Sequence, residues 1–360
     1  MLTLSRPLAA TIIIAASLLP TVVAIAFFGG HAGLWYAPFS PRVLTIALTA
    51  SLLVLWQRVR AARLEGEPKN IVEVVRDNPI ALLVPAVLIV LITFASAGFS
   101  FIKANIADYV PYYLDPPFVD ADRILFFGND PWRVSHALLG TWGTIALDRL
   151  YVLWFLLFPF LAIFIGGSAD RTFQFRAMIG VLVVLILLGN VMAVSMSSVG
   201  PIFYEYFYGN AYYAELMARL HAAHEVAPLT VLRLSDYLIE MHETDAFGTG
   251  ISAMPSVHVG FAVLSWLIVR DRVKARWAHR VAGVYAFLIW IGSFHLAWHY
   301  AWDGIVSAVV VIAAWKLSAF IEVAPRRSES KRPRLFDFSA REPARPLAKQ
   351  NTDFEIGSRV

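Results

Sequence analysis

The chain has 360 residues, of which 58% are hydrophobic and only 16% charged, with a formal net charge of +4. A soluble protein of this size could not bury so much apolar surface, so the composition excludes a soluble globular fold. There is no cysteine, which excludes a disulfide, a thiolate nucleophile and a zinc–thiolate site.

The apolar residues fall in blocks long enough to cross a bilayer, which takes about 20 residues per helix. The first block is longer than the core of a signal peptide and no clear cleavage site follows it, so we expect it to be retained. We predict an all-α integral membrane protein of about eight transmembrane helices, at residues 8–28, 40–56, 80–102, 150–167, 177–199, 255–270, 281–298 and 300–322.

The same blocks suggest three parts of the chain. Residues 1–79 would hold the first two spans and a cytoplasmic linker, in which 57–79 forms a short amphipathic helix on the inner surface. Residues 80–322 would form the membrane domain that carries the chemistry. Residues 323–360 are polar and basic and predict a disordered cytoplasmic tail.

Basic residues predict the orientation of the spans. With the amino terminus in the cytoplasm, the inside segments are short and dense in Lys and Arg, whereas the outside loops 103–149 and 200–254 are long and sparse in charge. This predicts a plasma or inner membrane protein with both termini cytoplasmic. Both long outer loops are rich in aromatic residues, and long loops between spans often act as lids.

Two short segments carry the candidate chemistry, Ser252-Ala253-Met254-Pro255-Ser256-Val257-His258 and His295-Leu296-Ala297-Trp298-His299-Tyr300-Ala301-Trp302-Asp303. The predicted topology places His258, His299 and Asp303 together at the outer face. Ionisable groups at the start of apolar spans are costly, and they usually serve a function.

Residues four apart share one face of a helix, so Asp303 can accept a hydrogen bond from the His299 imidazole. That bond would fix the tautomer and leave the other ring nitrogen free to attack phosphorus. Ser256, Val257 and His258 would open a helix after a cap at Ser252 or Met254, where free backbone N–H groups bind anions. His258 could then protonate the leaving alkoxide.

These segments resemble the second and third signature motifs of the type-2 phosphatidic acid phosphatase superfamily. The Ala-Met-Pro-Ser-Val-His and Trp-His-Tyr-Ala-Trp-Asp-Gly sequences resemble the branch of inositol-phosphorylceramide and sphingomyelin synthases, as do 200–203 and 122–132. The resemblance covers roughly residues 105–322. It implies a six-helix catalytic core in the C-terminal two-thirds, with His299 as nucleophile, Asp303 as its orienting carboxylate and His258 as acid.

The chain departs from the phosphatase branch at both phosphate-clamping cations. It has no Lys-x6-Arg-Pro first motif, and Ser293 stands where the third motif has Arg. The expected substitutes in phosphate binding are His295, Lys103 and Arg123, with Arg133 a further candidate. His221, His224 and Glu225 have metal-like spacing, but the predicted mechanism needs no metal, and we expect no metal and no cofactor.

We therefore expect a lipid phosphotransferase or phosphatase that acts through a phosphohistidine. It would pass a phospho-headgroup from a phospholipid or other lipid phosphate in the bilayer to an inositol-like alcohol or to water. One alternative is a polyprenyl-phosphate or pyrophosphate phosphatase. An alternative of another class is a non-catalytic membrane scaffold or a transporter, although a transporter usually carries ionisable groups at mid-membrane in paired repeats. No nucleic acid partner is expected.

Overall fold

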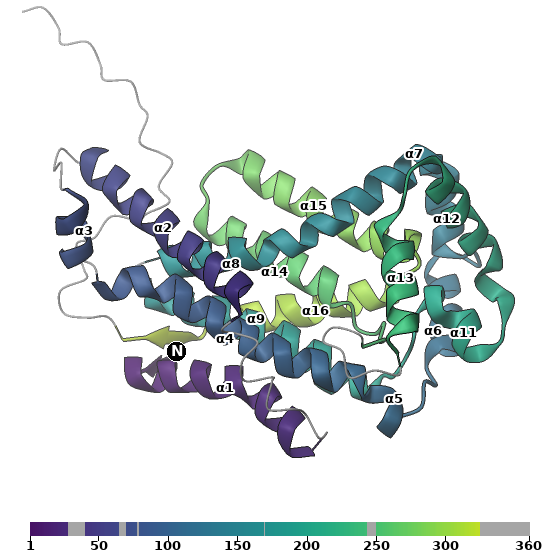
Figure 1. The fold of residues 1–360 in the computed structure, drawn as a ribbon, viewed down its shortest axis with the longest axis horizontal. Helices are drawn as coiled ribbons and strands as arrows, with labels where there is room; N and C mark the ends of the chain where they lie inside the picture. Colours follow the sequence, from purple (N-terminus) through teal and green to yellow (C-terminus); the bar gives the residue numbers. More distant parts are fainter. Residues whose placement is uncertain (28–39, 65–69, 78, 169, 243–249, 325–360) are drawn as a thin grey trace, which may run out of the picture.

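The computed structural model describes residues 1–27, 40–64, 70–77, 79–168, 170–242 and 250–324. Long helices run side by side through most of the molecule (Figure 1). They are α1 (Arg6–Phe27), α2 (Pro41–Leu64), α4 (Pro79–Ala104), α7 (Pro131–Val152), α8 (Leu157–Gly167), α9 (Arg171–Leu182), α14 (Val257–Arg272), α15 (Arg276–His295) and α16 (Ala301–Ser318).

Shorter elements connect these helices. The α-helices among them are α3 (Ile71–Asp77), α5 (Ile106–Tyr109), α6 (Asp115–Leu125), α10 (Ala193–Ser195), α11 (Tyr204–Tyr208), α12 (Ala214–Val226) and α13 (Thr230–Glu240). Three segments are 3-10 helices and one, η4, is a π-helix: η3 (Leu153–Leu156), η4 (Val183–Met192), η5 (Pro201–Phe203) and η6 (Ala211–Tyr213). Helices α6, α11, α12 and α13 gather at one end of the bundle, and we call them the cap (Figure 1).

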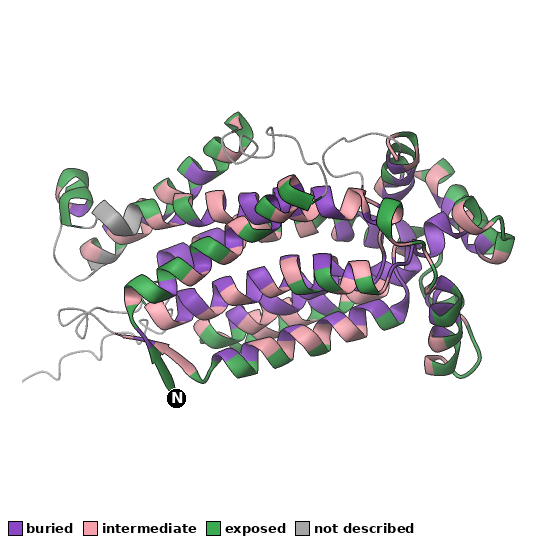
Figure 2. Cartoon of the chain, turned by 90° about the horizontal axis from the view of Figure 1, so that it is seen from below, coloured by how far each residue is buried: buried purple, intermediate pink, exposed green. Residues whose placement is uncertain are grey.

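Buried residues on the long helices face one another and exposed residues face outward (Figure 2). Many of the outward residues are large and apolar, such as Leu19, Val87, Phe287 and Val309. Such a surface suits lipid rather than water. Within the described residues, six helical stretches are long and apolar enough to cross a membrane: Arg6–Phe27, Pro41–Arg60, Leu83–Ala104, Pro131–Gly167, Arg171–Ser195 and Ala301–Ser318.

The six do not include α14, which has only 16 residues, or α15, although both pack in the same bundle against each other and against α16. The count of eight spans therefore stays a prediction. One predicted boundary is wrong: the helix expected at 150–167 begins at Pro131 and bends at Gly140, whose φ of 58° is open to glycine. The prediction failed because polar residues such as Arg133, His136 and Asp148 interrupt the apolar pattern there.

Two short strands join the ends of the described chain. Strand β1 (Leu2–Leu4) pairs in parallel with β2 (Ile321–Val323), and Arg6 Nε donates to the Ala324 carbonyl at 2.9 Å. Both strands lie at the end of the bundle opposite the cap (Figure 1). The chain therefore enters and leaves the bundle at one end, as an even number of crossings requires. Which side of the membrane that end faces stays a prediction.

The first helix packs directly on the predicted membrane domain. Thr21 Oγ1 donates to the Phe94 carbonyl of α4 at 2.6 Å, and a Cβ on Gly98 would collide with the backbone of Pro20. Over residues 57–79, where the sequence predicted one short helix, α2 continues to Leu64 and α3 is a separate helix from Ile71. Most of the predicted tail, residues 325–360, lies outside the described residues.

Candidate active site

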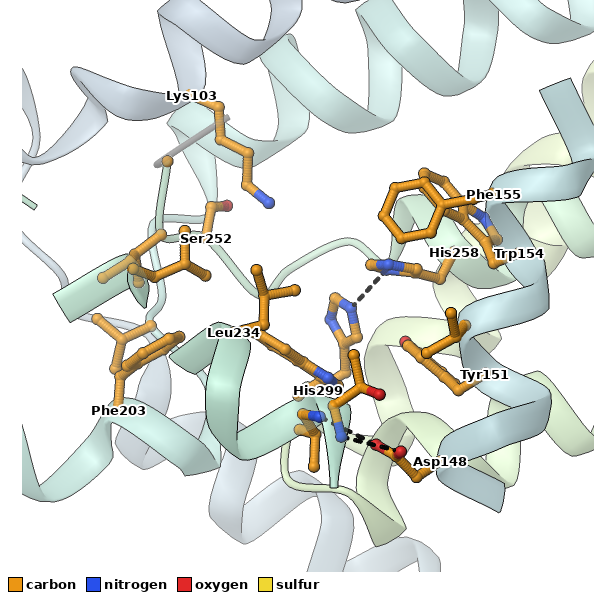
Figure 3. Close-up of a pocket in the computed structure, with 18 residues that line it drawn as sticks. Lys103, Asp148, Tyr151, Trp154, Phe155, Phe203, Leu234, Ser252, His258 and His299 are labelled. Carbon is orange, nitrogen blue, oxygen red and sulfur yellow. Dashed lines mark hydrogen bonds between the residues drawn. The ribbon is translucent and has the colours of Figure 1, made fainter. Parts of the chain in front are cut away.

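A pocket lies where the bundle meets the cap. It holds about 870 Å³ of empty space, including its open mouth. Its walls come from α4, α7, η3, α13, the start of α14 and the loop that joins α15 to α16. Figure 3 shows His258 and His299 side by side at its centre.

His299 lies in the turn between α15 and α16, with one ring nitrogen held and one open. Its Nδ1 lies 2.7 Å from the carbonyl oxygen of Ala253, which can only accept, so Nδ1 carries the proton. Its Nε2 is 3.4 Å from Nδ1 of His258. The lone pair of His299 is therefore on Nε2, at the pocket, and the ring is 4% exposed.

Asp303 supports this tautomer from the first turn of α16. Its Oδ2 lies 3.3 Å from His299 Nδ1 and accepts the backbone N–H of Tyr300 at 3.1 Å. The Ala253 carbonyl is the closer partner of Nδ1. Asp303, which the sequence predicted as the residue that fixes the tautomer of His299, therefore shares this role with the Ala253 carbonyl. The other carboxylate oxygen, Oδ1, is buried and has no hydrogen-bond partner among the described residues.

His258 lies on the first turn of α14, and the cap of this helix differs from the prediction. Ser256 is the N-cap, since its Oγ accepts the N–H of Val259 at 3.3 Å, and neither Ser252 nor Met254 has that role. The hydroxyl of Ser256 is thereby occupied and its residue fully buried. The backbone N–H groups of Val257 and His258 occupy the helical positions that have no partner within a helix.

Aromatic rings hold the His258 imidazole in place. The ring centroid of Trp154 is 4.4 Å from that of His258, and the centroid of Tyr151 is 4.9 Å away. Both rings come from one turn of the α7–η3 segment and line the pocket. These two rings set the orientation of the His258 ring beside His299.

Two aspartates of α6 fix the loop that carries His299. Asp115 accepts the backbone N–H groups of Val199 and Gly200 and the hydroxyls of Tyr208 and Tyr300. Burial raises the pKa of Asp115, and these donors oppose that shift. Gly200 has a φ of 88°, and a Cβ there would lie 2.7 Å from the Trp298 carbonyl oxygen.

The second aspartate, Asp122, caps α16. It accepts the backbone N–H groups of Ala301 at 2.8 Å and Trp302 at 2.9 Å, as an acidic residue at a helix N-terminus can. Burial raises the pKa of Asp122 to about 7. Helix α6 thus holds the turn that follows His299 through hydrogen bonds that its Asp115 and Asp122 carboxylates accept.

Lys103 brings positive charge to the pocket from the last turn of α4. Its ammonium group points toward the two histidines (Figure 3). The Nζ atom lies 6.0 Å from the ring centroid of Phe99, and no carboxylate of the described residues forms an ion pair with it.

The structure does not bring the other predicted phosphate-binding side chains to this pocket. His295 is fully buried; its Nδ1 lies 2.8 Å from Ser135 Oγ, its Nε2 lies 2.8 Å from Thr144 Oγ1, and its ring stacks on His136. Arg123 is exposed on α6 and is not among the lining residues. Arg133 pairs with Asp130 and Glu215 on the surface. None of these three residues therefore lines the pocket that contains His258 and His299.

Several residues of the site carried no signal in the sequence. Tyr151 and Trp154 are two aromatic residues among many, in a span whose start was misplaced. Asp115 and Asp122 are two of several acidic residues in a long loop, and the turn after His299 that they hold lies 179 to 185 residues further along the chain. Within the described residues, no cluster of three or more His, Cys, Asp or Glu side chains could hold a metal ion.

A second pocket shares the two histidines and extends into the bundle. It runs between α4, α8 and η4, where Phe99, Phe155, Phe158 and Leu185 line it, and it also contains Val257 of α14. Lys103, Trp154, His258 and His299 line both pockets. One pocket therefore reaches the cap and the other reaches the apolar interior, and they meet at the imidazoles.

A sequence profile of the PAP2 superfamily matches residues 117–317, which is more than half of the chain. The chain belongs to the PAP2 superfamily. This membership indicates a phosphatase or phosphotransferase of lipid metabolism, in agreement with the apolar surface and the bilayer-length helices. No curated protein and no solved structure showed significant similarity to the chain.

Proposed function

We propose that this PAP2 superfamily member transfers a phosphoryl or phospho-headgroup from a lipid through a phosphohistidine at His299. One observation carries the proposal: His299 Nδ1 is held by Ala253 and Asp303 while Nε2 faces a pocket. A held Nδ1–H leaves a nucleophilic lone pair on the opposite nitrogen.

In the first step His299 Nε2 attacks phosphorus and the bond from phosphorus to the lipid oxygen breaks. The phosphate enters beside Nε2, and the His258 ring, whose Nδ1 is 3.4 Å from Nε2 in the resting protein, moves back to the far side of phosphorus. There the protonated His258 ring lies beside the leaving oxygen, opposite the attacking nitrogen, and gives it a proton, so the lipid departs as an alcohol and His258 is left neutral. Asp303, buried beside Nδ1, balances the positive charge that develops on the His299 ring.

In the second step water or an alcohol attacks the phosphohistidine. His258, now without its proton, accepts one from the attacking hydroxyl, and the bond between Nε2 and phosphorus breaks. From a phosphomonoester donor, water gives free phosphate and an alcohol gives a new phosphomonoester. From a phosphodiester donor, water gives the phosphomonoester of the headgroup and an alcohol gives a new phosphodiester. The enzyme returns to its starting protonation state in either case.

The two pockets that meet at His258 and His299 support a lipid as the donor of the phosphate. The second pocket, between α4, α8 and η4, offers aromatic and aliphatic walls to a hydrocarbon chain. Lys103, which lines both pockets, offers charge to the phosphate, and the backbone N–H groups of Val257 and His258 at the start of α14 offer donors. A lipid could reach this second pocket from the bilayer without passing between the helices of the cap.

We further propose that the chain belongs to the synthase-like branch of the superfamily. The His-Tyr-Ala-Trp-Asp sequence at 299–303 and the Ser at 293 resemble the synthase branch that transfers phospho-headgroups to alcohols such as inositol. Ser293 is fully buried and its Oγ donates to the Trp290 carbonyl, so it cannot replace a guanidinium at the pocket. The active site would face the outer side, with both termini in the cytoplasm.

A product screen tests the proposal. Purified protein in lipid nanodiscs is given phosphatidic acid, phosphatidylinositol or a polyprenyl phosphate, with and without inositol or glycerol, and products are resolved by mass. We expect turnover of at least one lipid. Free phosphate, or a headgroup phosphomonoester formed without added alcohol, marks a phosphatase, and a phosphoester of inositol or glycerol that forms only when that alcohol is added marks a transferase. Turnover of none of them, together with protein-dependent solute flux, would favour a transporter instead.

A further inference from the structure

We infer that the hydroxyl of Tyr151 donates a hydrogen bond to the phosphate during transfer, in the place of a guanidinium clamp. The inference rests on the proposed function, because it requires the phosphate at His299. It assigns a role to a residue that the sequence motifs do not include.

The Tyr151 hydroxyl is a buried donor with no use in the resting protein. The residue is 6% exposed, and its oxygen has no hydrogen-bond partner among the described residues. Burial of an unsatisfied hydroxyl is costly, so a residue that keeps one usually has a ligand for it. In Figure 3 this hydroxyl points to the centre of the pocket, toward His299.

The ring of Tyr151 is fixed on both sides. One side lies against His258, with ring centroids 4.9 Å apart. The other lies against α15, where a Cβ on Gly292 would come within 3.0 Å of the Tyr151 ring. A donor held in this way needs no reorganisation when charge develops on the phosphate oxygens, which is the condition for strong transition-state stabilisation.

Trp154 adds a second observation of the same kind. Its Nε1–H is also buried without a partner among the described residues, and its ring packs on His258. The Tyr151 hydroxyl and the ammonium group of Lys103 therefore point toward the imidazole pair, while the hydroxyl of Ser293 is turned away. That set suits a phosphate, which offers acceptor oxygens and negative charge.

The matched pair Tyr151→Phe and Tyr285→Phe tests the inference. Tyr285 lies on α15, and its hydroxyl is likewise buried without a partner among the described residues, but it lines neither pocket. We expect Tyr151→Phe to lower kcat/KM for 32P-labelled phosphatidic acid roughly 100-fold, as loss of one preorganised donor does. Calorimetry with orthovanadate should show weaker binding by a similar factor. Tyr285→Phe should match wild type in both.

Three results would overturn the inference. Tyr151→Phe could keep wild-type kcat/KM, it could lose turnover while binding orthovanadate normally, or Tyr285→Phe could lose as much. The second result, with a lower melting temperature, would assign Tyr151 a packing role only. His299→Gln serves as the reference: if it keeps turnover, the proposed function fails, whereas an inactive His299→Gln beside a normal Tyr151→Phe removes this inference alone.

Discussion

Two histidine pairs, one buried and one with His258 partly exposed, lie at the same end of the bundle, and they differ in what their nitrogens contact. In the pair of His136 and His295, the rings stack 3.8 Å apart, and both nitrogens of His295 have hydroxyl partners. In the pair of His258 and His299, one nitrogen is held and the other faces a pocket. Burial alone therefore does not mark a reactive histidine, whereas an open nitrogen opposite a held one does.

The largest effect should separate the two pairs directly. His299→Gln removes the attacking nitrogen, and we expect turnover of the preferred lipid to fall by about 10⁴-fold or more, as when a covalent nucleophile is lost. The melting temperature should change little. Initial rates and thermal unfolding in detergent measure the two quantities.

His295→Gln is the matched change in the other pair. It leaves the Ser135 and Thr144 hydroxyls without their ring partners, which costs about 1–3 kcal/mol of folding free energy. We therefore expect a lower melting temperature with turnover of the folded protein close to wild type. A variant with unchanged stability and abolished turnover would show that the comparison between the pairs is wrong.

His258→Gln should have the next largest effect, about 10²- to 10⁴-fold on turnover of a lipid phosphate, because a general acid is lost. An aryl phosphate with a nitrophenolate leaving group needs no proton. The same variant should lose much less activity on that substrate. Equal losses on both substrates would assign His258 a role other than proton transfer.

The contrast between Lys103 and Arg123 is smaller. Lys103→Met removes the only cation that we find at the imidazoles within the described residues, and we expect KM for phosphatidic acid to rise about 10-fold. Arg123→Met should leave KM unchanged because Arg123 is exposed away from the pocket. A larger effect from Arg123 would restore the role that the sequence suggested for it.

The smallest effect concerns Asp122, whose carboxylate accepts the first backbone N–H groups of α16. Burial raises the pKa of Asp122 to about 7, so the folded chain holds this proton more tightly than the unfolded chain. Its contribution to stability is thus greatest below pH 4 and declines as pH rises toward 7. We expect Asp122→Asn to flatten this decline in a melting-temperature profile, and Asp120→Asn, on an exposed neighbouring position, to leave it as in wild type.

The sequence predicted the parts of the site that lie in local motifs. Spacing of four placed Asp303 beside His299, and the apolar blocks predicted the bundle. It could not reveal the Ala253 carbonyl, Asp115, Asp122 or Tyr151, because these residues reach the site by tertiary packing across 46 to 185 positions of the chain. For His295, the spacing of four residues suggested that it lies beside His299, whereas the end of α15 turns its ring toward Ser135 and Thr144 of α7.

The most direct test of the account is to trap the covalent intermediate. Protein mixed with 32P-labelled phosphatidic acid, or a labelled polyprenyl phosphate, is quenched in alkali, where phosphohistidine survives, and the labelled peptide is mapped by mass. The account predicts label on Nε2 of His299, present in wild type and in Tyr285→Phe and absent from His299→Gln. Label on His258 or His295, or full turnover by His299→Gln, would contradict it.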